Sequence, residues 1–554
     1  MISKRLRLFL AALGGFLLLA PFWIPAAPEL NGRNVPMSKD SLMILGASLW
    51  IMLLFPFVVP NALLTGARKF AGFVRRFFIP FAILFLGVLL FSLYLVNQKI
   101  LHAFMNSADE HSCYFLAECL RMGKWWIVPP PLSEFFNVVH VGNRDGKWFS
   151  VYPPGWPALM AVALQWNVLD WLNPVLTILA VIFLFLAAKK VYGWTVSWVG
   201  IALVSVTPYF LFTGASYFSH STCLLMIGIF YFAMLKWEES TEESKKIFWI
   251  SVAGVAAGYG LATRYLTMLA FIAPFILHHI YLLIRRREKW SKSHTVFTAI
   301  LVVSMALILS HNYIVTGKIT KAPNRYDKRW ERLGFRDDYT ILDGLIFIVA
   351  RYFYLIDWTA PVLTVVFILS LFQKRKMSPT QQIFRWAFFY PVIAYFFYFS
   401  WGGNQFGPRY YYEGYPFLIF TALDSLRYGW REGSVQAKKI ALAVVLVALI
   451  TPVFPFLKFA KYFETVSRER KALYVLAEST IEKPALVFIK GFLGDTLVMS
   501  EDDAVRNSPR LNAKVLYAHD MGEKNQLLRN LYPQREAYRG SFDRTAKQAR
   551  LEKI

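Results

Sequence analysis

The sequence has little charge and few cysteines for its length. Only 17% of its 554 residues are charged and 56% are hydrophobic, whereas soluble domains carry about 25% charged residues. This excludes an ordinary soluble enzyme of several domains, and also a disordered chain, a collagen or a coiled coil. Three cysteines, Cys113, Cys119 and Cys223, are too few for a disulfide framework or a zinc ribbon. A Cys113–Cys119 bridge is one alternative, but we favour free buried thiols.

What the sequence has instead is a series of long apolar runs. The core of a bilayer is about 30 Å thick, which a helix crosses in about 20 residues. Thirteen such runs occur, near 6–28, 41–63, 77–97, 173–190, 194–213, 217–236, 247–263, 266–284, 296–315, 353–373, 384–401, 413–428 and 439–457. We therefore predict an all-α polytopic membrane protein with about 13 transmembrane helices.

The net charge of +25 is explained by membrane topology. Short cytoplasmic loops collect lysine and arginine, and the chain starts with Lys4, Arg5 and Arg7. Alternating the spans from a cytoplasmic N-terminus places the other basic clusters, such as Arg285–Arg287, on the same side. An odd number of spans sends the C-terminal segment outside. The charge therefore indicates contact with membrane lipids and no nucleic-acid partner.

The chain divides into three parts by composition. Residues 1–76 hold two N-terminal spans, the first of which we interpret as an uncleaved helix rather than a signal peptide. Residues 77–457 hold the other eleven spans, together with a long outer loop at 98–172. Residues 458–554 have the composition of a soluble domain. We predict that this last part is a small extracytoplasmic α/β domain.

Strand and helix signals support that last prediction. Stretches 485–489 and 514–517 have the composition of strands, and 524–531 has the composition of a helix. What this domain binds is not readable from these signals.

The outer loop opens with a pair of carboxylates, Asp109 and Glu110, directly after a span and before His111. Two adjacent carboxylates repel each other, which raises one pKa and suits a general base or a metal ligand. A solvated start of a loop is the alternative interpretation.

The same loop closes with Tyr152, Pro153, Pro154, Gly155 and Trp156. Proline at this density stiffens a chain without secondary structure, and tryptophan and tyrosine anchor it at the level of the lipid headgroups. We predict that this segment is a lid on the outer surface.

These motifs carry a resemblance to a known family. The carboxylate pair, the segment 117–124 (AECLRMGK) and the segment 152–157 (YPPGWP) resemble the GT-C superfamily. They are most similar to its branch of protein mannosyltransferases and aminoarabinose transferases, glycosyltransferase family 39. The hydropathy pattern agrees over residues 77–457.

The resemblance implies an integral membrane transferase that takes a sugar from a polyprenyl-phosphate carrier. It would pass that sugar to a glycolipid, glycan or protein acceptor on the extracytoplasmic face of a bacterial inner membrane. Direct displacement would invert the sugar, with Asp109 as the first choice of base and Glu110 as the second.

The leaving group would be a phosphate, which needs positive charge at the outer ends of helices. Arg264, Arg351 and Arg409 occupy such positions and are the candidate phosphate ligands. A snorkelling arginine is the alternative for each of them.

A metal site is less well supported by the motifs. The family generally has a second acidic residue in the short outer loop, which here reads 214–220 (GASYFSH) and has no carboxylate. His111 and His220, with Asp109, are the only candidates for divalent-metal ligands, and no cofactor is firmly expected.

Two other classes of function remain open. A flippase or transporter of lipid-linked saccharides would show paired repeats and ionisable residues near the middle of the membrane, and neither is evident. An envelope polysaccharide polymerase or ligase shares large outer loops and arginines, but not the segment 152–157 after an acidic pair.

Overall fold

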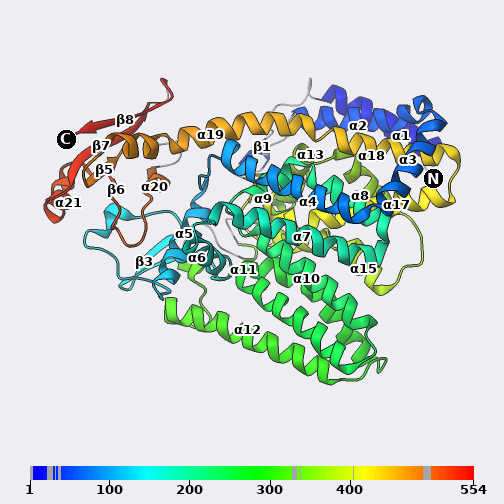
Figure 1. Ribbon diagram of the computed structural model, residues 1–554, viewed down its shortest axis with the longest axis horizontal. Coiled ribbons are helices and arrows are strands. Elements are labelled where there is room, and N and C mark those ends of the chain that lie inside the picture. The colour runs from blue at the N-terminus through cyan, green and yellow to red at the C-terminus, as the bar shows by residue number, and fades with distance from the viewer. Residues whose placement is uncertain are drawn as a thin grey trace.

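The computed structural model describes residues 4–20, 29–30, 33–34, 39–326, 333–336, 339–403, 405–490, 501–543 and 545–554. A bundle of helices fills most of the molecule, and a small sheet at the C-terminus lies at one end of it (Figure 1). The fold class predicted from the sequence, a polytopic helical membrane protein with a small C-terminal α/β domain, is confirmed.

The N-terminal helices lie along one side of the bundle. They are α1 (Lys4–Leu19), α2 (Lys39–Val58), α3 (Asn61–Arg76) and α4 (Phe78–Leu95), which continues as the π-helical turn η2 (Val96–Ile100). A two-stranded pair, β1 (Glu29–Leu30) and β2 (Arg33–Asn34), lies between the first two helices along the chain. Pro60 lies between α2 and the amphipathic α3, where a proline interrupts the helical hydrogen bonds. The two helices are bent by 102° relative to each other.

The remaining helices make up the body of the bundle. They are α7 (Leu169–Tyr192), α8 (Trp194–Ser205), α9 (Pro208–Ala215), α10 (His220–Glu239), α11 (Glu243–Ile284), α12 (Lys292–Thr316), α13 (Ile341–Trp358), α14 (Pro361–Leu371), α15 (Pro379–Trp386), α16 (Phe389–Phe396), α17 (Tyr415–Glu432), α18 (Val435–Ile450) and α19 (Val453–Thr480). Two 3-10 turns, η4 (Pro323–Tyr326) and η5 (Arg409–Gly414), lie in the connections. Proline begins several of these helices, so breaks in the bundle follow the prolines of the sequence.

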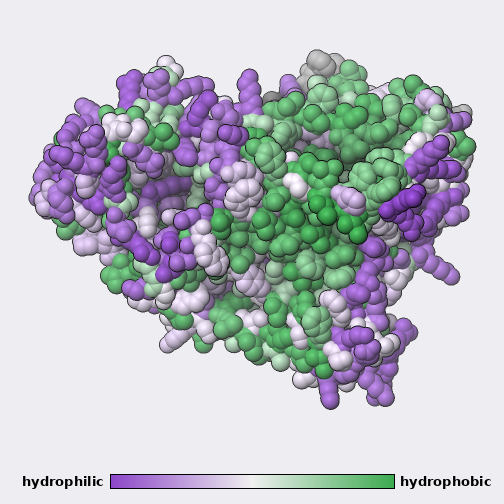
Figure 2. Space-filling model, in the orientation of Figure 1, coloured by the Kyte–Doolittle hydropathy of each residue, from purple (hydrophilic) through white to green (hydrophobic). Residues whose placement is uncertain are grey.

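Apolar surface covers the middle of the bundle on the face shown in Figure 2. Six helices among the described residues are long and apolar enough to cross a membrane, or up to eight if each bent pair is one span. In Figure 2, apolar side chains cover the region of α4, α7 and α8, while polar side chains gather at the two ends. The other expected runs fall on helices that are short or broken, such as α13 and α14, which Pro361 separates.

The helix α11 folds back on itself beside α10. Its 42 residues contain one break, at Arg264, where φ is −145° and ψ is 80°. Near its beginning Trp249 contacts Phe232, and near its end His279 contacts Trp237, so both ends lie beside the end of α10. The two runs expected at 247–263 and 266–284 are therefore the two halves of α11, and Arg264 is the turn between them.

The long loop at 98–172 is an ordered layer. It contains α5 (Ala108–Arg121), the 3-10 turn η3 (Ser133–Phe136), the antiparallel hairpin β3 (Val141–Arg144) and β4 (Lys147–Ser150), and α6 (Gly155–Gln165). Cys113 and Cys119 on α5 and Cys223 on α10 are free and buried, as we favoured from the sequence.

The C-terminal domain covers this layer. Its sheet has the order β6-β5-β7-β8, with β5 (Ala485–Ile489) parallel to β6 (Val515–His519) and β7 (Glu536–Asp543), and with β8 (Gln548–Lys553) antiparallel to β7. The helices α20 (Glu501–Ala504) and α21 (Asn525–Leu531) and the turn η6 (Gly522–Lys524) connect the strands.

Both faces of the central strand are covered, which explains its uninterrupted apolar sequence. Leu486 and Phe488 pack with Phe115 and Trp148 of the loop layer, whereas Val487 packs with Leu473 at the end of α19. A strand buried on both faces has no polar side to present. The sheet is thereby fixed against the loop that begins with Asp109.

Candidate functional site

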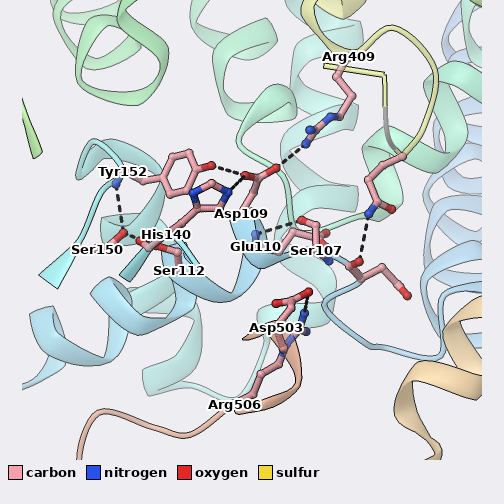
Figure 3. A network of polar contacts seen from close by, with 12 residues as sticks. Ser107, Asp109, Glu110, Ser112, His140, Ser150, Tyr152, Arg409, Asp503 and Arg506 are labelled. Carbon is pink, nitrogen blue, oxygen red and sulfur yellow. Dashed lines mark hydrogen bonds and ion pairs between the residues drawn. The ribbon is translucent and has the colours of Figure 1, made fainter. Parts of the chain in front are cut away.

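The first turn of α5 separates the two adjacent carboxylates. Ser107 is the N-cap, its side chain accepts the backbone N–H of Glu110, and Glu110 in turn accepts the backbone N–H of Ser107 at 3.0 Å. This reciprocal capping box satisfies two N–H groups that the helix leaves free. It turns Glu110 inward and leaves Asp109 pointing to the other side (Figure 3).

Asp109 faces three donors. Arg409 Nη1 donates to Oδ2 at 2.8 Å, the Tyr152 hydroxyl donates to Oδ1, and His140 Nε2 lies 3.4 Å from Oδ1. Burial raises the pKa of Asp109, but the charge of Arg409, with His140 and the Tyr152 hydrogen bond, outweighs it and holds the pKa well below its usual range. Asp109 is therefore an ionised carboxylate paired with an arginine.

Glu110 has the opposite environment. Its side chain is almost fully buried, and its second oxygen accepts the backbone N–H of Tyr217 at 2.8 Å. Burial raises the pKa of Glu110 to about 7, against the two backbone N–H groups that favour its charge. The expected repulsion within the pair thus contributes less than the difference in surroundings.

Asp109 borders a cavity of about 590 Å³. Its walls come from the start of α5, the connection 217–220, the break in α11, the end of α16 with residues 398–400, the segment 405–410, and Arg470 and Asp503 of the C-terminal part. Asp109, Glu110, Arg264 and Arg409 all border it, so the structure brings these four predicted residues to one cavity.

Arg409 is fixed by a tight turn. Gly407 has φ of +77°, and a Cβ there would lie 2.9 Å from Tyr209, so this position favours glycine. The Tyr209 hydroxyl donates to the carbonyl of Pro408 at 2.7 Å, and the guanidinium of Arg409 lies 4.5 Å from the centre of the Phe218 ring. The side chain therefore reaches Asp109 from a rigid support.

Arg264 lies across the cavity with a carboxylate of its own. Its Nε is 3.4 Å from Glu413 Oε1, and its Nη groups donate to Ser219 Oγ and the Tyr395 hydroxyl at 3.3 and 3.2 Å. Glu413, on η5, is fully buried and also contacts His220 Nδ1 at 3.0 Å. Both arginines of the cavity are thus paired with a carboxylate, Arg409 with Asp109 in the lining and Arg264 with the buried Glu413 behind it.

Arg351 does not border the cavity. Its three nitrogens donate to the backbone carbonyls of Tyr395, Ser400 and Trp401 at 3.0, 2.7 and 3.0 Å, and the side chain is fully buried. Three of the five N–H groups of the guanidinium thus bind backbone carbonyls, one on each nitrogen. This placement favours support of the end of α16, which carries Tyr395, and of the segment that follows it over the binding of phosphate.

The segment predicted as a lid is held in place. Tyr152 and Pro153 border the cavity, and Pro154 is the N-cap of α6. Gly155 touches α11 so closely that a Cβ would lie 2.4 Å from Thr263 Oγ1, and Trp156 Nε1 donates to the carbonyl of Tyr217 at 2.8 Å. In this structure the segment forms a packed wall rather than a loose cover.

The side chains do not suit a divalent cation. Both oxygens of Asp109 accept from donors, and Arg409 and Arg264 bring positive charge to the same space. His111 is buried on α5 outside the cavity lining, where burial and the charge of Arg506 lower its pKa, and His220 is paired with Glu413. Across the described ranges, Asp109, His111 and His220 form no group with metal-ligand spacing.

The C-terminal domain holds the segment that carries Asp109. Arg506 donates to the carbonyl of Met105 and to Asp503 Oδ2, the latter at 2.8 Å, and Arg470 donates to the carbonyl of Asn106. Figure 3 shows Arg506 and Asp503 next to the start of α5. The domain therefore contributes to the cavity wall and to the position of α5.

Three residues at the site, His140, Tyr395 and Glu413, were not predicted from the sequence. His140 and Tyr395 lie among ordinary loop and aromatic residues and carry no motif. Glu413 could have been found, because an ionisable residue at the start of an apolar run is costly unless it has a partner.

Residues 160–314 match a family model described as dolichyl-phosphate-mannose-protein mannosyltransferase. The match confirms the resemblance to this branch of the GT-C glycosyltransferases, and with it the prediction of a membrane enzyme of the glycosyltransferase class. The matched segment includes Arg264 and His220 but neither Asp109 nor Arg409. No curated protein sequence matches the chain.

Several solved structures are similar at low identity. ArnT from Cupriavidus metallidurans, bound to undecaprenyl phosphate, is 11% identical, with 86% of this chain and 98% of that chain covered and a TM-score of 0.48. An oligosaccharyltransferase from Archaeoglobus fulgidus in its apo form is 11% identical, with 74% and 62% covered and a TM-score of 0.45. All these likenesses are loose, and by themselves they establish neither the site nor the substrate.

Proposed function

We propose that this protein transfers a sugar from a polyprenyl-phosphate carrier to an acceptor at the extracytoplasmic face of a bacterial inner membrane. The observation that carries the proposal is the single cavity that joins the ionised Asp109 to Arg409 and Arg264. The acceptor is a glycolipid, glycan or protein, and the description of the matched family, which names a lipid-phosphate mannose donor and a protein acceptor, supports this range.

The Asp109–Arg409 pair suggests how donor binding starts the reaction. Arg409 holds the pKa of Asp109 low, which makes the carboxylate a weak base. An anionic phosphate that entered the cavity would compete for the guanidinium, since arginine binds phosphate in a bidentate fork. As Arg409 turned to the phosphate, the pKa of Asp109 would rise and its strength as a base would increase.

The reaction is then a single displacement. Asp109 takes the proton from an acceptor hydroxyl, and the acceptor oxygen forms a bond to the anomeric carbon of the sugar. The bond from that carbon to the phosphate oxygen breaks, and polyprenyl phosphate leaves with its electron pair, stabilised by Arg409 and Arg264. The sugar is transferred once, so its configuration inverts.

The purified protein in detergent tests this directly. A panel of undecaprenyl-phosphate-linked sugars is supplied, and the release of undecaprenyl phosphate is measured by mass spectrometry. We expect Asp109→Asn to lower the rate by about 100-fold or more, as the loss of a general base does. Glu118→Gln is the control, because Glu118 is also buried on α5 but pairs with Arg121.

An unchanged rate for Asp109→Asn would remove the assignment of the base. Nuclear magnetic resonance of the product reports the anomeric configuration, and retention would contradict the single displacement. Movement of the lipid-linked sugar across sealed vesicles without covalent change would support a transporter instead.

A further inference from the structure

A second cluster of ionisable side chains lies at the end of the bundle opposite the cavity. Here α10 ends, α11 ends and α12 begins. His279 on α11, Glu288 in the connection and His294 on α12 each offer one donor atom, and these atoms lie within 4.8 Å of one another. In the part of the chain that the structure describes, no other group of three histidine, cysteine or carboxylate side chains has such spacing.

Within this group, one ring nitrogen of each histidine faces an oxygen of Glu288. His279 Nδ1 lies 2.9 Å from Glu288 Oε2, and His294 Nε2 lies 3.3 Å from Glu288 Oε1. Zinc bonds of about 2.0–2.1 Å place neighbouring ligand atoms of a tetrahedral site roughly 3.3 Å apart. The two spacings are therefore close to those of a metal site.

The outer nitrogens of both rings already face a supporting group. His279 Nε2 lies 3.6 Å from Glu238 Oε1 on α10, whereas His294 Nδ1 accepts the backbone N–H of Ser291 at 3.2 Å and lies 2.8 Å from Ser291 Oγ. Histidines that bind metals commonly pass their other ring N–H to a carboxylate or another acceptor, which fixes the ring and its tautomer. Glu238 can fill that role for His279. For His294, Nδ1 would have to carry the ring proton and donate it to Ser291 Oγ, giving up the Ser291 backbone N–H.

The cluster is shielded from water on one side. The side chains of His279, Glu288 and His294 are 13%, 24% and 11% exposed, and the ring of Trp237 lies 4.8 and 5.4 Å from the two imidazole rings. His294 Nε2 is buried and faces Glu288 Oε1 at 3.3 Å. A cation between these two atoms would replace that contact.

Two carboxylates belong to the cluster, although the chain around it is basic. Glu238 and Glu288 contribute two negative charges, whereas Lys246 acts on His294 with positive charge. The arginines 285–287 are exposed to solvent, where water and salt screen them. Two imidazoles with one carboxylate suit zinc, since magnesium and calcium prefer oxygen ligands alone.

We propose that His279, Glu288 and His294 bind one Zn²⁺, with Glu238 orienting the imidazole of His279 and the Ser291 hydroxyl accepting from His294 Nδ1 in the bound state. The ion would join the ends of α10, α11 and α12 at the end of the bundle far from Asp109. The proposal does not rest on the sugar-transfer reaction, because the ligands lie outside that cavity.

Metal binding to the full-length protein in detergent tests this. The protein is treated with a chelator, desalted and titrated with zinc chloride, and the bound metal is measured by plasma mass spectrometry. We expect one equivalent for the unaltered protein and none for His279→Ala and His294→Ala. His278→Ala is the matched control, since His278 neighbours His279 but does not belong to the group, and it should keep one equivalent.

Two further measurements distinguish zinc that these ligands coordinate from zinc that binds nonspecifically. Glu238→Gln should keep the site but weaken zinc about tenfold, as the loss of an outer carboxylate does. Cobalt(II) should give the visible absorption of tetrahedral coordination with the unaltered protein, a reading that does not depend on how well any variant folds. No bound zinc and no such absorption in the unaltered protein would overturn the proposal, as would equal binding by His294→Ala.

Discussion

At the scale of single residues, Asp109 and Glu110 show how neighbours decide the chemistry of a side chain. The two are adjacent on α5, yet the pKa of Asp109 is lowered and that of Glu110 is raised to about 7. Asp109 meets Arg409, whereas Glu110 is buried against backbone. The sequence alone indicated an acidic pair and could not tell which member would stay charged.

The raised pKa of Glu110 predicts a dependence of stability on pH. An ordinary glutamate has a pKa of 4.5, so between pH 4.5 and 7 the folded protein holds a proton that the unfolded chain does not. The contribution of Glu110 to the free energy of unfolding is therefore greatest below pH 4.5 and declines as the pH rises to 7. The decline amounts to about 3 kcal/mol, from roughly 1.4 kcal/mol for each pKa unit.

Thermal unfolding in detergent from pH 4.5 to 8 checks this against Glu110→Gln, which does not titrate. The melting temperature of the unaltered protein should fall relative to that of the variant as pH rises. A difference that stays constant over this range would mean that Glu110 keeps an ordinary pKa in the folded protein.

Arg409 is the residue for which a lysine should be a poor substitute. Lysine keeps the charge but loses the planar fork that can hold a phosphate and the stacking on Phe218. The loss of one hydrogen bond to a charged group costs roughly 1.5 kcal/mol, so we expect Arg409→Lys to raise the KM for the lipid-linked donor about tenfold. Arg121→Lys, on α5 and paired with Glu118, is the control and should leave that KM unchanged.

At the scale of elements, the sequence predicted the helices and strands that nearby residues signal. It missed those that depend on partners far away in the chain. The apolar runs predicted helices, and the run 485–489 predicted β5, because each of these signals is local. β7 and β8 were missed, since β7 interleaves three buried residues with half-buried and exposed ones and β8 is a largely exposed edge strand. Alternation over a few residues is a weak signal next to a continuous apolar run.

The same division applies to the candidate site. Asp109, Arg264 and Arg409 were found because they stand beside span ends or in a marked turn. The pairing of His220 with Glu413 joins residues 193 positions apart, and no local pattern carries it. Arg351 had the same signal as Arg409, but its burial among three carbonyls depends on the fold of the loop 395–401.

The contact between the C-terminal domain and α5 predicts a positioning role for Arg506. Removing this side chain frees the carbonyl of Met105 and lets the start of α5 shift. A displacement of about 1 Å at a reacting group can cost on the order of 100-fold in rate. We therefore expect Arg506→Ala to lower kcat by about tenfold to 100-fold with little change in the donor KM.

Arg510→Ala is the matched control for that experiment. Arg510 lies in the same segment, its side chain is 40% exposed, and its Nε lies 3.7 Å from Glu118 Oε2. Equal kcat values for the two variants would show that the hold of Arg506 on Met105 does not position Asp109.

At the scale of the whole molecule, the cavity and the zinc-binding cluster that we propose lie at opposite ends of the bundle. α10 begins at the cavity with His220 and ends beside the cluster with Glu238 and Glu239. The basic segment 285–292 belongs to the cluster end. Because cytoplasmic loops collect basic residues, the cavity end is expected to face away from the cytoplasm.

Cysteine labelling tests this orientation without reference to activity. The three native cysteines are buried, so an impermeant maleimide should label the unaltered protein weakly. Ser479→Cys places an exposed thiol at the end of α19, on the cavity side, and Ser244→Cys places one near the start of α11, on the cluster side. In bacterial spheroplasts we expect labelling of Ser479→Cys at once and of Ser244→Cys only after the membrane is broken. The reverse pattern would place Asp109 in the cytoplasm, where nucleotide sugars are available, and a lipid-linked donor would no longer be needed to explain the site.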